Sequence, residues 1–87
     1  MAWAVRLADE CERSLLKLDK QVARRILVKL YGLADLDDPQ SRCKALTGAL
    51  AGLWRLRVGD YRLLLDIQRD QLVIVALDAG HRRSIYD

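Results

Sequence analysis

The sequence predicts an α+β fold, in which an N-terminal strand, a two-helix hairpin and a three-stranded antiparallel meander form one sheet with the helices on one face. Three patterns predict it. Apolar residues alternate over residues 2–7, recur at helical spacing over residues 9–36, and flank the pair Gly59-Asp60 as in a two-residue hairpin. A chain of 87 residues has room for one domain, and we assign residues 1–87 to it.

The two helices have recognisable starts and one clear stop. Asp9 is expected to cap the first helix, which runs to about Leu18. Asp19 is expected to cap the second, which covers roughly residues 20–36 with an apolar residue at every third or fourth position. Pro39 ends this helix, because proline cannot continue the hydrogen-bond ladder and disfavours helix in the residue before it.

The hairpin around Gly59-Asp60 sorts its side chains onto two faces. Residues on one strand alternate between faces, so the apolar residues of both strands fall on one side. Arg57 then lies opposite Arg62, and Arg55 shares that second face. The polar segment 40–52 before the hairpin is expected to be an irregular surface connection that holds Lys44 near the sheet.

A second turn at Arg69-Asp70 leads to the last predicted strand. Residues 71–79 include the run LVIVAL and are expected to be buried on both sheet faces. The chain then closes beyond this strand with residues 80–87. The order of elements places both helices on one face of the sheet and leaves the arginine-bearing face partly open.

Charge distribution says more than net charge. The formal charge is only +3, which says little about nucleic acid. The basic residues after Leu53, however, fall largely into two groups, which are Arg55, Arg57 and Arg62, and then His81, Arg82 and Arg83. Like charges directly opposite one another destabilise a sheet, so the first group either splays into water or holds an anion.

Other functional classes find little support. No apolar run approaches the roughly 20 residues that cross a bilayer, and the N-terminus lacks the pattern of a signal peptide. Cys11 and Cys43 have no metal-binding spacing and do not suggest a disulfide scaffold. We therefore expect a cytoplasmic protein with reduced thiols, no metal, no cofactor and no membrane partner.

Two long stretches resemble the RelE branch of the RelE/ParE toxin superfamily. They are KALTGALAGLWRLRVGDYRLLLDI and LVIVALDAGHRRSIY, and the helical half LLKLDKQVARRILVKLYGLADLDDP is also similar. The resemblance implies a toxin of a type II toxin–antitoxin system that cleaves messenger RNA in the ribosomal A site and so inhibits translation. It implies as partners a cognate antitoxin, the ribosome and its messenger RNA, and operator DNA only through the antitoxin. The alternative is a ParE-like toxin that inhibits DNA gyrase without nuclease activity.

The same resemblance assigns roles to particular positions. It implies catalytic roles for Arg57, Arg62, Arg82 and Tyr86, and an RNA-binding role for Arg55. We also expect Lys44, His81 and Arg83 to bind RNA. Arg83 is a possible substitute for Arg82, because the spacing before the terminal tyrosine varies in the family. The chain departs from the best-known members in one respect, since they carry lysines where it has Arg55 and Arg57.

The chemistry of RNA cleavage leaves the proton-transfer groups open. Arginine is not deprotonated in proteins, so the arginines are expected to clamp the phosphate and not to act as bases. Tyr86 is the favoured acid or base and His81 its rival; alternatively the ribosome positions the RNA and Tyr86 stacks on a base. Simpler interpretations are a solvated arginine surface, a packing role for His81, and a Tyr86 that closes the edge of the core. A further alternative is a degenerate, non-toxic member of the family that only binds its antitoxin and operator DNA.

Overall fold

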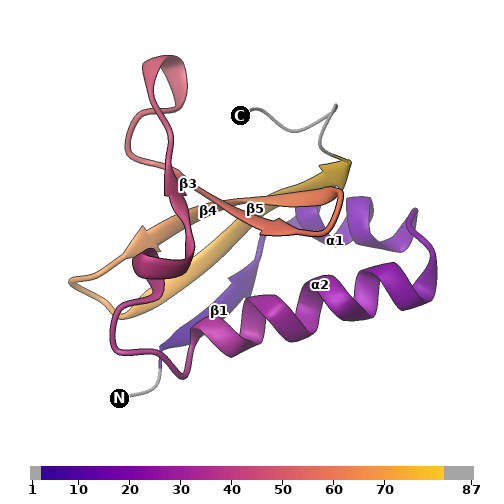
Figure 1. The fold of residues 1–87 in the computed structure, drawn as a ribbon, viewed down its shortest axis with the longest axis horizontal. Helices are drawn as coiled ribbons and strands as arrows, with labels where there is room; N and C mark the ends of the chain where they lie inside the picture. Colours follow the sequence, from indigo (N-terminus) through magenta and orange to yellow (C-terminus); the bar gives the residue numbers. More distant parts are fainter. Residues whose placement is uncertain (1–2, 82–87) are drawn as a thin grey trace.

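Two helices lie against one side of a five-stranded sheet in the computed structural model, which describes residues 3–81 (Figure 1). The helices are α1 (Asp9–Leu16) and α2 (Lys20–Leu33). The strands are β1 (Ala4–Leu7), β2 (Lys44–Ala45), β3 (Trp54–Val58), β4 (Tyr61–Gln68) and β5 (Val73–His81). Short 3₁₀ turns, η1 (Pro39–Arg42) and η2 (Gly48–Leu50), flank β2. The predicted α+β class is confirmed.

The sheet has the strand order β1-β5-β4-β3-β2, in which β1 runs parallel to β5 and every other pair is antiparallel. The sequence predicted four strands, because the two-residue strand β2 lies inside the segment expected to be irregular. Such a short strand has no pattern of its own and forms only because β3 offers it an edge. β5 likewise lies inside the sheet, and not at its edge, because β1 pairs with it.

Of the two predicted helix caps, the structure confirms one and shows that the other is wrong. The Asp19 carboxylate accepts a hydrogen bond from the backbone N–H of Gln21 at 3.0 Å, which confirms the predicted cap of α2. Asp9 does not cap α1: Ala8 occupies that position without a side-chain bond, and Asp9 is the first helical residue. An acidic residue there still favours the helix, because it faces the positive end of the helix dipole.

Both helices end earlier than predicted. The N–H groups of Ala34 and Leu36 bond to carbonyls three residues back, at 3.1 Å each, so the turn after Leu33 is tightened and no longer α-helical. Leu18 makes the same three-residue bond after α1, at 3.2 Å. The apolar periodicity continues through these tightened turns, which explains why it overestimates helix length.

The β3–β4 hairpin has the predicted register. Leu56 pairs with Leu63 and Arg57 pairs with Arg62 across the Gly59-Asp60 turn. Gly59 has φ +60°, whereas Asp60 keeps a negative φ. A positive φ at the first central residue alone is the pattern of a type II′ turn, which matches the twist of the two strands.

The last strand begins and ends later than predicted. β5 starts at Val73, because Leu72 adopts φ +54° in the preceding turn, and it continues to His81. Its pairing with β4 shifts register between Leu64 and Leu65, which marks a β-bulge. Only one face of β5 is fully buried: Ile74 is inaccessible, whereas Val75 is half-buried. The expectation of burial on both faces was therefore wrong, because helices cover a single face of the sheet.

The core lies between the helices and the covered sheet face. Its largest inaccessible side chains are Ile26, Leu30, Leu56, Leu63, Leu65, Ile74, Pro39 and Cys11. One polar bond joins the layers, in which the Ser14 hydroxyl of α1 donates to the Asp78 carboxylate of β5 at 2.7 Å. The Asp78 carboxylate also accepts the backbone N–H of Ala79 at 2.8 Å, next to the bulge. The bond from Ser14 holds the second half of β5 against α1, and the bond from Ala79 fixes the carboxylate that accepts it.

Replacing a central core residue should destabilise the fold. Leu63→Ala should lower the free energy of unfolding by about 3 kcal/mol, because it leaves a cavity where the side chain is 0% exposed. Leu16→Ala, at a side chain that is 84% exposed, should change it by less than about 0.5 kcal/mol. Urea denaturation of the two variants measures the difference. Equal midpoints for Leu63→Ala and the wild type would contradict this description of the core.

Candidate functional site

Four basic side chains gather on the sheet face away from the helices. We call this the arginine face; its members are Lys44, Arg55, Arg57 and Arg62. Lys44 of β2 pairs with Arg55 of β3, and Arg57 of β3 pairs with Arg62 of β4. Directly paired residues share a face with their side chains about 5 Å apart at Cβ. The sheet register therefore brings together four of the eight residues singled out from the sequence.

The members of the arginine face differ in burial. Arg55 and Arg62 are half-buried, and the Nε atom of each is withdrawn from solvent, as is Nη1 of Arg62. Arg57 is exposed, and its Nε donates to the Gly59 carbonyl at 3.2 Å, which folds the guanidinium back over the turn. Gly80 pairs with Arg62 on the other side and carries no side chain to cover it. The cluster is therefore partly embedded in the sheet instead of extending freely into water.

A cluster of this kind suits a phosphate-bearing ligand. Each guanidinium presents a planar fork of donors that matches phosphate oxygens, and several forks around one phosphate would neutralise its charge. Arg57 and Arg62 face each other across the hairpin, and like charges in this arrangement repel. An anion bound beside both would be attracted to both.

His81 lies apart from the arginine face. It pairs with Tyr61, and the two rings make an edge-to-face contact with centroids 5.6 Å apart and an interplanar angle of 83°. Because paired residues share a face, His81 lies with Tyr61 on the opposite face from Arg62. Three further predicted site residues lie outside the described residues; they are Arg82, Arg83 and Tyr86.

The two cysteines are free thiols in poorly reactive surroundings. Burial raises the pKa of the Cys11 thiol from 9.0 to about 11, and the nearby carboxylates of Asp78 and Glu12 add to the rise. Burial alone raises the pKa of Cys43 to about 11. Over residues 3–81, no group of three or more His, Cys, Asp or Glu side chains is arranged to hold a metal ion. None of the helices described there has the length and apolar character to span a membrane.

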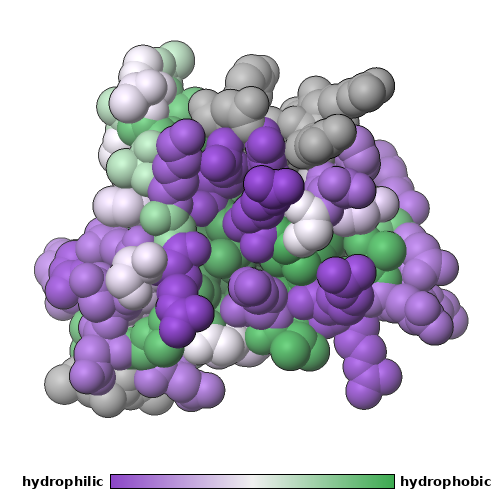
Figure 2. All heavy atoms as spheres, viewed as in Figure 1, coloured by the Kyte–Doolittle hydropathy of each residue, from purple (hydrophilic) through white to green (hydrophobic). Residues whose placement is uncertain are grey.

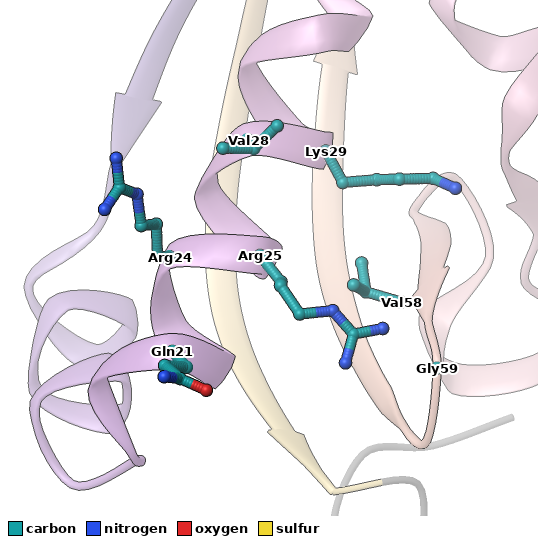
Figure 3. Close-up of a pocket in the computed structure, with 7 residues that line it drawn as sticks. All are labelled: Gln21, Arg24, Arg25, Val28, Lys29, Val58 and Gly59. Carbon is teal, nitrogen blue, oxygen red and sulfur yellow. The ribbon is translucent and has the colours of Figure 1, made fainter.

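A second feature, which sequence analysis missed, is a hollow between α2 and the β3–β4 hairpin. Its volume is about 560 Å³, and its lining residues are Gln21, Arg24, Arg25, Val28, Lys29, Val58 and Gly59. Figure 2 shows apolar atoms in this hollow beneath a hydrophilic rim. In Figure 3, Arg25 and Lys29 reach from α2 toward the hairpin, whereas Arg24 points away. The signal in the sequence was the charge of α2, KQVARRILVKLYGL, which has four basic and no acidic residues.

A family model, sequence identity to a known protein and solved structures all relate this chain to toxins of toxin–antitoxin systems. Residues 5–86 match the family model described as the ParE toxin of the type II toxin–antitoxin system, parDE. The chain is 33% identical over 87 residues to Toxin RelG of Mycobacterium tuberculosis (strain ATCC 25618 / H37Rv), covering 99% of this chain and 98% of that protein.

Two solved complexes contain chains of closely similar structure. The toxin–antitoxin complex RelBE2 from Mycobacterium tuberculosis matches with a TM-score of 0.86 and 30% identity, over 94% of this chain and 93% of the other. The archaeal RelE–RelB complex from Pyrococcus horikoshii OT3 matches with a TM-score of 0.73 and 28% identity, over 94% of this chain and 97% of the other.

The raised thiol pKa values predict slow alkylation. At pH 8 the thiolate fraction of a group with a pKa of about 11 is roughly 100-fold below that of one at 9.0, so iodoacetamide should label the folded protein far more slowly than the urea-unfolded protein. Labelling should accelerate as the pH rises toward 11, because the thiols then ionise. Mass spectrometry of timed samples measures both rates. Equal rates for folded and unfolded protein at pH 8 would contradict the burial of these thiols.

Proposed function

Because this chain belongs to the ParE toxin family of type II toxin–antitoxin systems, we propose that it is a ribosome-dependent endoribonuclease of the RelE kind. It cleaves messenger RNA in the A site without a metal ion and thereby inhibits translation. The observation that carries this proposal is the arginine face, which concentrates three guanidinium groups on two neighbouring strands. A partly buried, positively charged cluster is suited to stabilising a phosphate that gains negative charge during the reaction.

The proposed reaction is an internal transfer followed by departure of the 5′-oxygen. The 2′-oxygen of a nucleotide forms a bond to the adjacent phosphorus while its proton passes to a base, and the bond from phosphorus to the 5′-oxygen breaks. The leaving oxygen takes up a proton, so the products are a 2′,3′-cyclic phosphate and a free 5′-hydroxyl. Water can then attack the cyclic phosphate, which breaks its bond to the 2′-oxygen and leaves a 3′-phosphate and a 2′-hydroxyl. The phosphate carries extra negative charge in the transition state, and donors placed around it lower the barrier.

We assign the residues of the arginine face to different parts of the RNA according to their positions on the strands. Arg57 and Arg62 pair directly across the hairpin and are assigned to the reacting phosphate. Lys44 and Arg55 pair on the neighbouring strands and are assigned to the adjoining RNA backbone. The half-buried position of Arg62 suits a donor to the reacting phosphate, because a donor with restricted freedom needs less reorganisation during the reaction.

Tyr86 is the group we assign to proton transfer. Arginine holds its protons at any ordinary pH, so the base or acid must be another residue. His81, the rival, packs edge-to-face against Tyr61 on the other sheet face, which favours Tyr86. Arg82 and Arg83, on the C-terminal side of β5, are proposed to add charge at the same phosphate or along the RNA. Surrounding guanidinium groups would lower the pKa of a tyrosine by stabilising its phenolate.

The proposed partners follow from the solved relatives. The relatives from Mycobacterium tuberculosis and Pyrococcus horikoshii are toxin–antitoxin complexes. We propose that a cognate antitoxin binds this chain and silences it, and that contact with operator DNA is made through the antitoxin. The site of action is the ribosome in the cytoplasm.

A second candidate is inhibition of DNA gyrase by binding alone. The family model that matches residues 5–86 carries the ParE name, and this favours the alternative. The two candidates differ in what they require of the arginine face. Cleavage needs a charged cluster focused on one phosphate, whereas a gyrase inhibitor has no chemical need for it.

Primer extension on a defined messenger in a purified translation system tests the nuclease. The wild type should cut within A-site codons only when ribosomes are present, and Arg62→Ala should cut at least about 100-fold more slowly, because it removes a transition-state donor. Arg13→Ala, an exposed arginine on α1, is the matched control and should cut at the wild-type rate.

The same proteins distinguish the second candidate in a gyrase supercoiling assay. An intact messenger together with loss of supercoiling would overturn the nuclease proposal in favour of gyrase. Cleavage that persists in the absence of ribosomes would contradict the dependence on the A site, and equal cutting by Arg62→Ala would contradict the assignment of the arginine face.

A further inference from the structure

β5 carries one extra residue where it pairs with β4. Leu65 pairs with Ala76, whereas Leu64 pairs with Asp78, so Leu77 is skipped at this β-bulge. The extra residue shifts by one position every pair that follows it toward the end of β5. The bulge therefore sets the register of the second half of the strand.

This register determines which residue lies opposite Arg62 of the arginine face. In the structure Arg62 pairs with Gly80, which carries no side chain to cover it. A continuous strand without the extra residue would place Ala79 opposite Arg62, with a methyl group beside the arginine side chain. The segment 82–87, which follows β5, would also begin one position further along. The bulge therefore affects both Arg62 and the place from which the C-terminal segment starts.

Two hydrogen bonds to one carboxylate hold the bulge. Oδ1 of Asp78 accepts the hydroxyl of Ser14 at 2.7 Å and the backbone N–H of Ala79 at 2.8 Å. The second bond fixes the backbone within the bulge, and the first ties the bulge to α1, which packs against β5 (Figure 1). Ser14 and Asp78 are half-buried, so water competes less for these bonds than it would at an exposed site.

The charge of Asp78 disfavours the continuous strand as well. Without the extra residue Asp78 would lie opposite Leu63, whose side chain is inaccessible in the core. A carboxylate is costly to bury among apolar side chains without hydrogen-bond partners. In the structure Ala79 takes this position and is itself buried. The two hydrogen bonds and the charge therefore favour the same register.

We propose that Asp78 and Ser14 are positioning residues for cleavage. They hold the bulge that leaves Arg62 opposite a glycine and that sets where the chain continues into residues 82–87. Their hydrogen bond lies between α1 and the sheet, away from the arginine face, so both act on the reaction through Arg62 and the C-terminal segment and not by contact with RNA. The inference rests on the proposed function for the reaction that is positioned.

Cleavage kinetics on messenger-loaded ribosomes test this role. Asp78→Ala removes both bonds and the charge, so kcat should fall about 100-fold, because a displacement of about 1 Å can cost a catalytic group this much. KM for the loaded ribosome should change by less than about threefold, since a shift in alignment affects the transition state more than binding. Asp78→Asn keeps an oxygen that can accept both bonds and should cleave within about threefold of the wild-type rate.

Two serine variants form a matched pair. Ser14→Ala removes one of the two bonds to the carboxylate and should lower kcat about tenfold. Ser41→Ala removes a hydrogen bond of similar length, in which the hydroxyl donates to the Asp38 carbonyl at 2.8 Å in an exposed turn, and should cleave at the wild-type rate. Thermal denaturation confirms that each variant is folded. If Asp78→Ala does not fold, the comparison of Ser14→Ala with Ser41→Ala decides the proposal.

NMR measures the register without any nuclease activity. The wild type and Asp78→Asn should give backbone NOEs between Arg62 and Gly80, whereas Asp78→Ala should give them between Arg62 and Ala79. A folded Asp78→Ala that keeps the wild-type register, or that cleaves with the wild-type kcat, would overturn the proposal. So would an Asp78→Asn that keeps the register and yet cleaves as slowly as Asp78→Ala.

Failure of the nuclease proposal would give a different result. A wild type that does not cut would contradict the proposed function, and the NOE comparison would still decide whether Asp78 sets the register opposite Arg62.

Discussion

The register of the β3–β4 hairpin is the constraint on which the rest of the structure depends. Gly59 supplies the positive φ that a two-residue type II′ turn requires, and the turn then fixes which residues face one another. A slip of one residue would turn Leu56 and Leu63 toward solvent and drive the arginines into the core. The burial of these leucines therefore holds Arg57 opposite Arg62, although the two charges repel each other.

The same turn lies between the arginine face and the hollow beside α2. Gly59 lines this hollow, and a Cβ atom at this position would lie 3.6 Å from the guanidinium of Arg25. On the other side, its carbonyl accepts the hydrogen bond from Arg57. The conformation of this one glycine therefore affects both the hollow and the placement of one of the arginines.

The parts of the fold that were predictable are the local ones. The hairpin register and the Asp19 cap depend on neighbours within a few residues, and both were read correctly from the sequence. The parts that were missed depend on distant contacts: β2 exists because β3 offers an edge, and β1 pairs with a strand far along the chain. The hydrogen bond from Ser14 to Asp78 joins residues 64 positions apart, and no local sequence pattern predicts it.

The candidate site likewise has a part that local sequence predicts and a part that depends on distant contacts. Arg55, Arg57 and Arg62 were placed together from alternation alone, because one hairpin carries all three. Lys44 was expected near the sheet, and its pairing with Arg55 needed the short strand β2. His81 was grouped with the basic residues by sequence proximity to Arg82 and Arg83, yet the strand continues through it and turns its ring toward Tyr61. The hollow between α2 and the β3–β4 hairpin was missed because periodicity identifies the buried side of a helix and gives no information about what its exposed side faces.

The arginine face carries the distinction between cutting RNA and binding gyrase, because the fold is common to both kinds of toxin. A binding surface gains from charges that remain mobile and hydrated, since they adapt to the partner at little cost. The Nε atoms of Arg55 and Arg62 are instead withdrawn from solvent, and Arg57 is held over the turn. Guanidinium groups held in this way adapt less to a partner, and fixed donors are most useful where charge develops on a phosphate during a reaction. The restricted placement of the cluster is therefore the reason for which we propose a catalytic role.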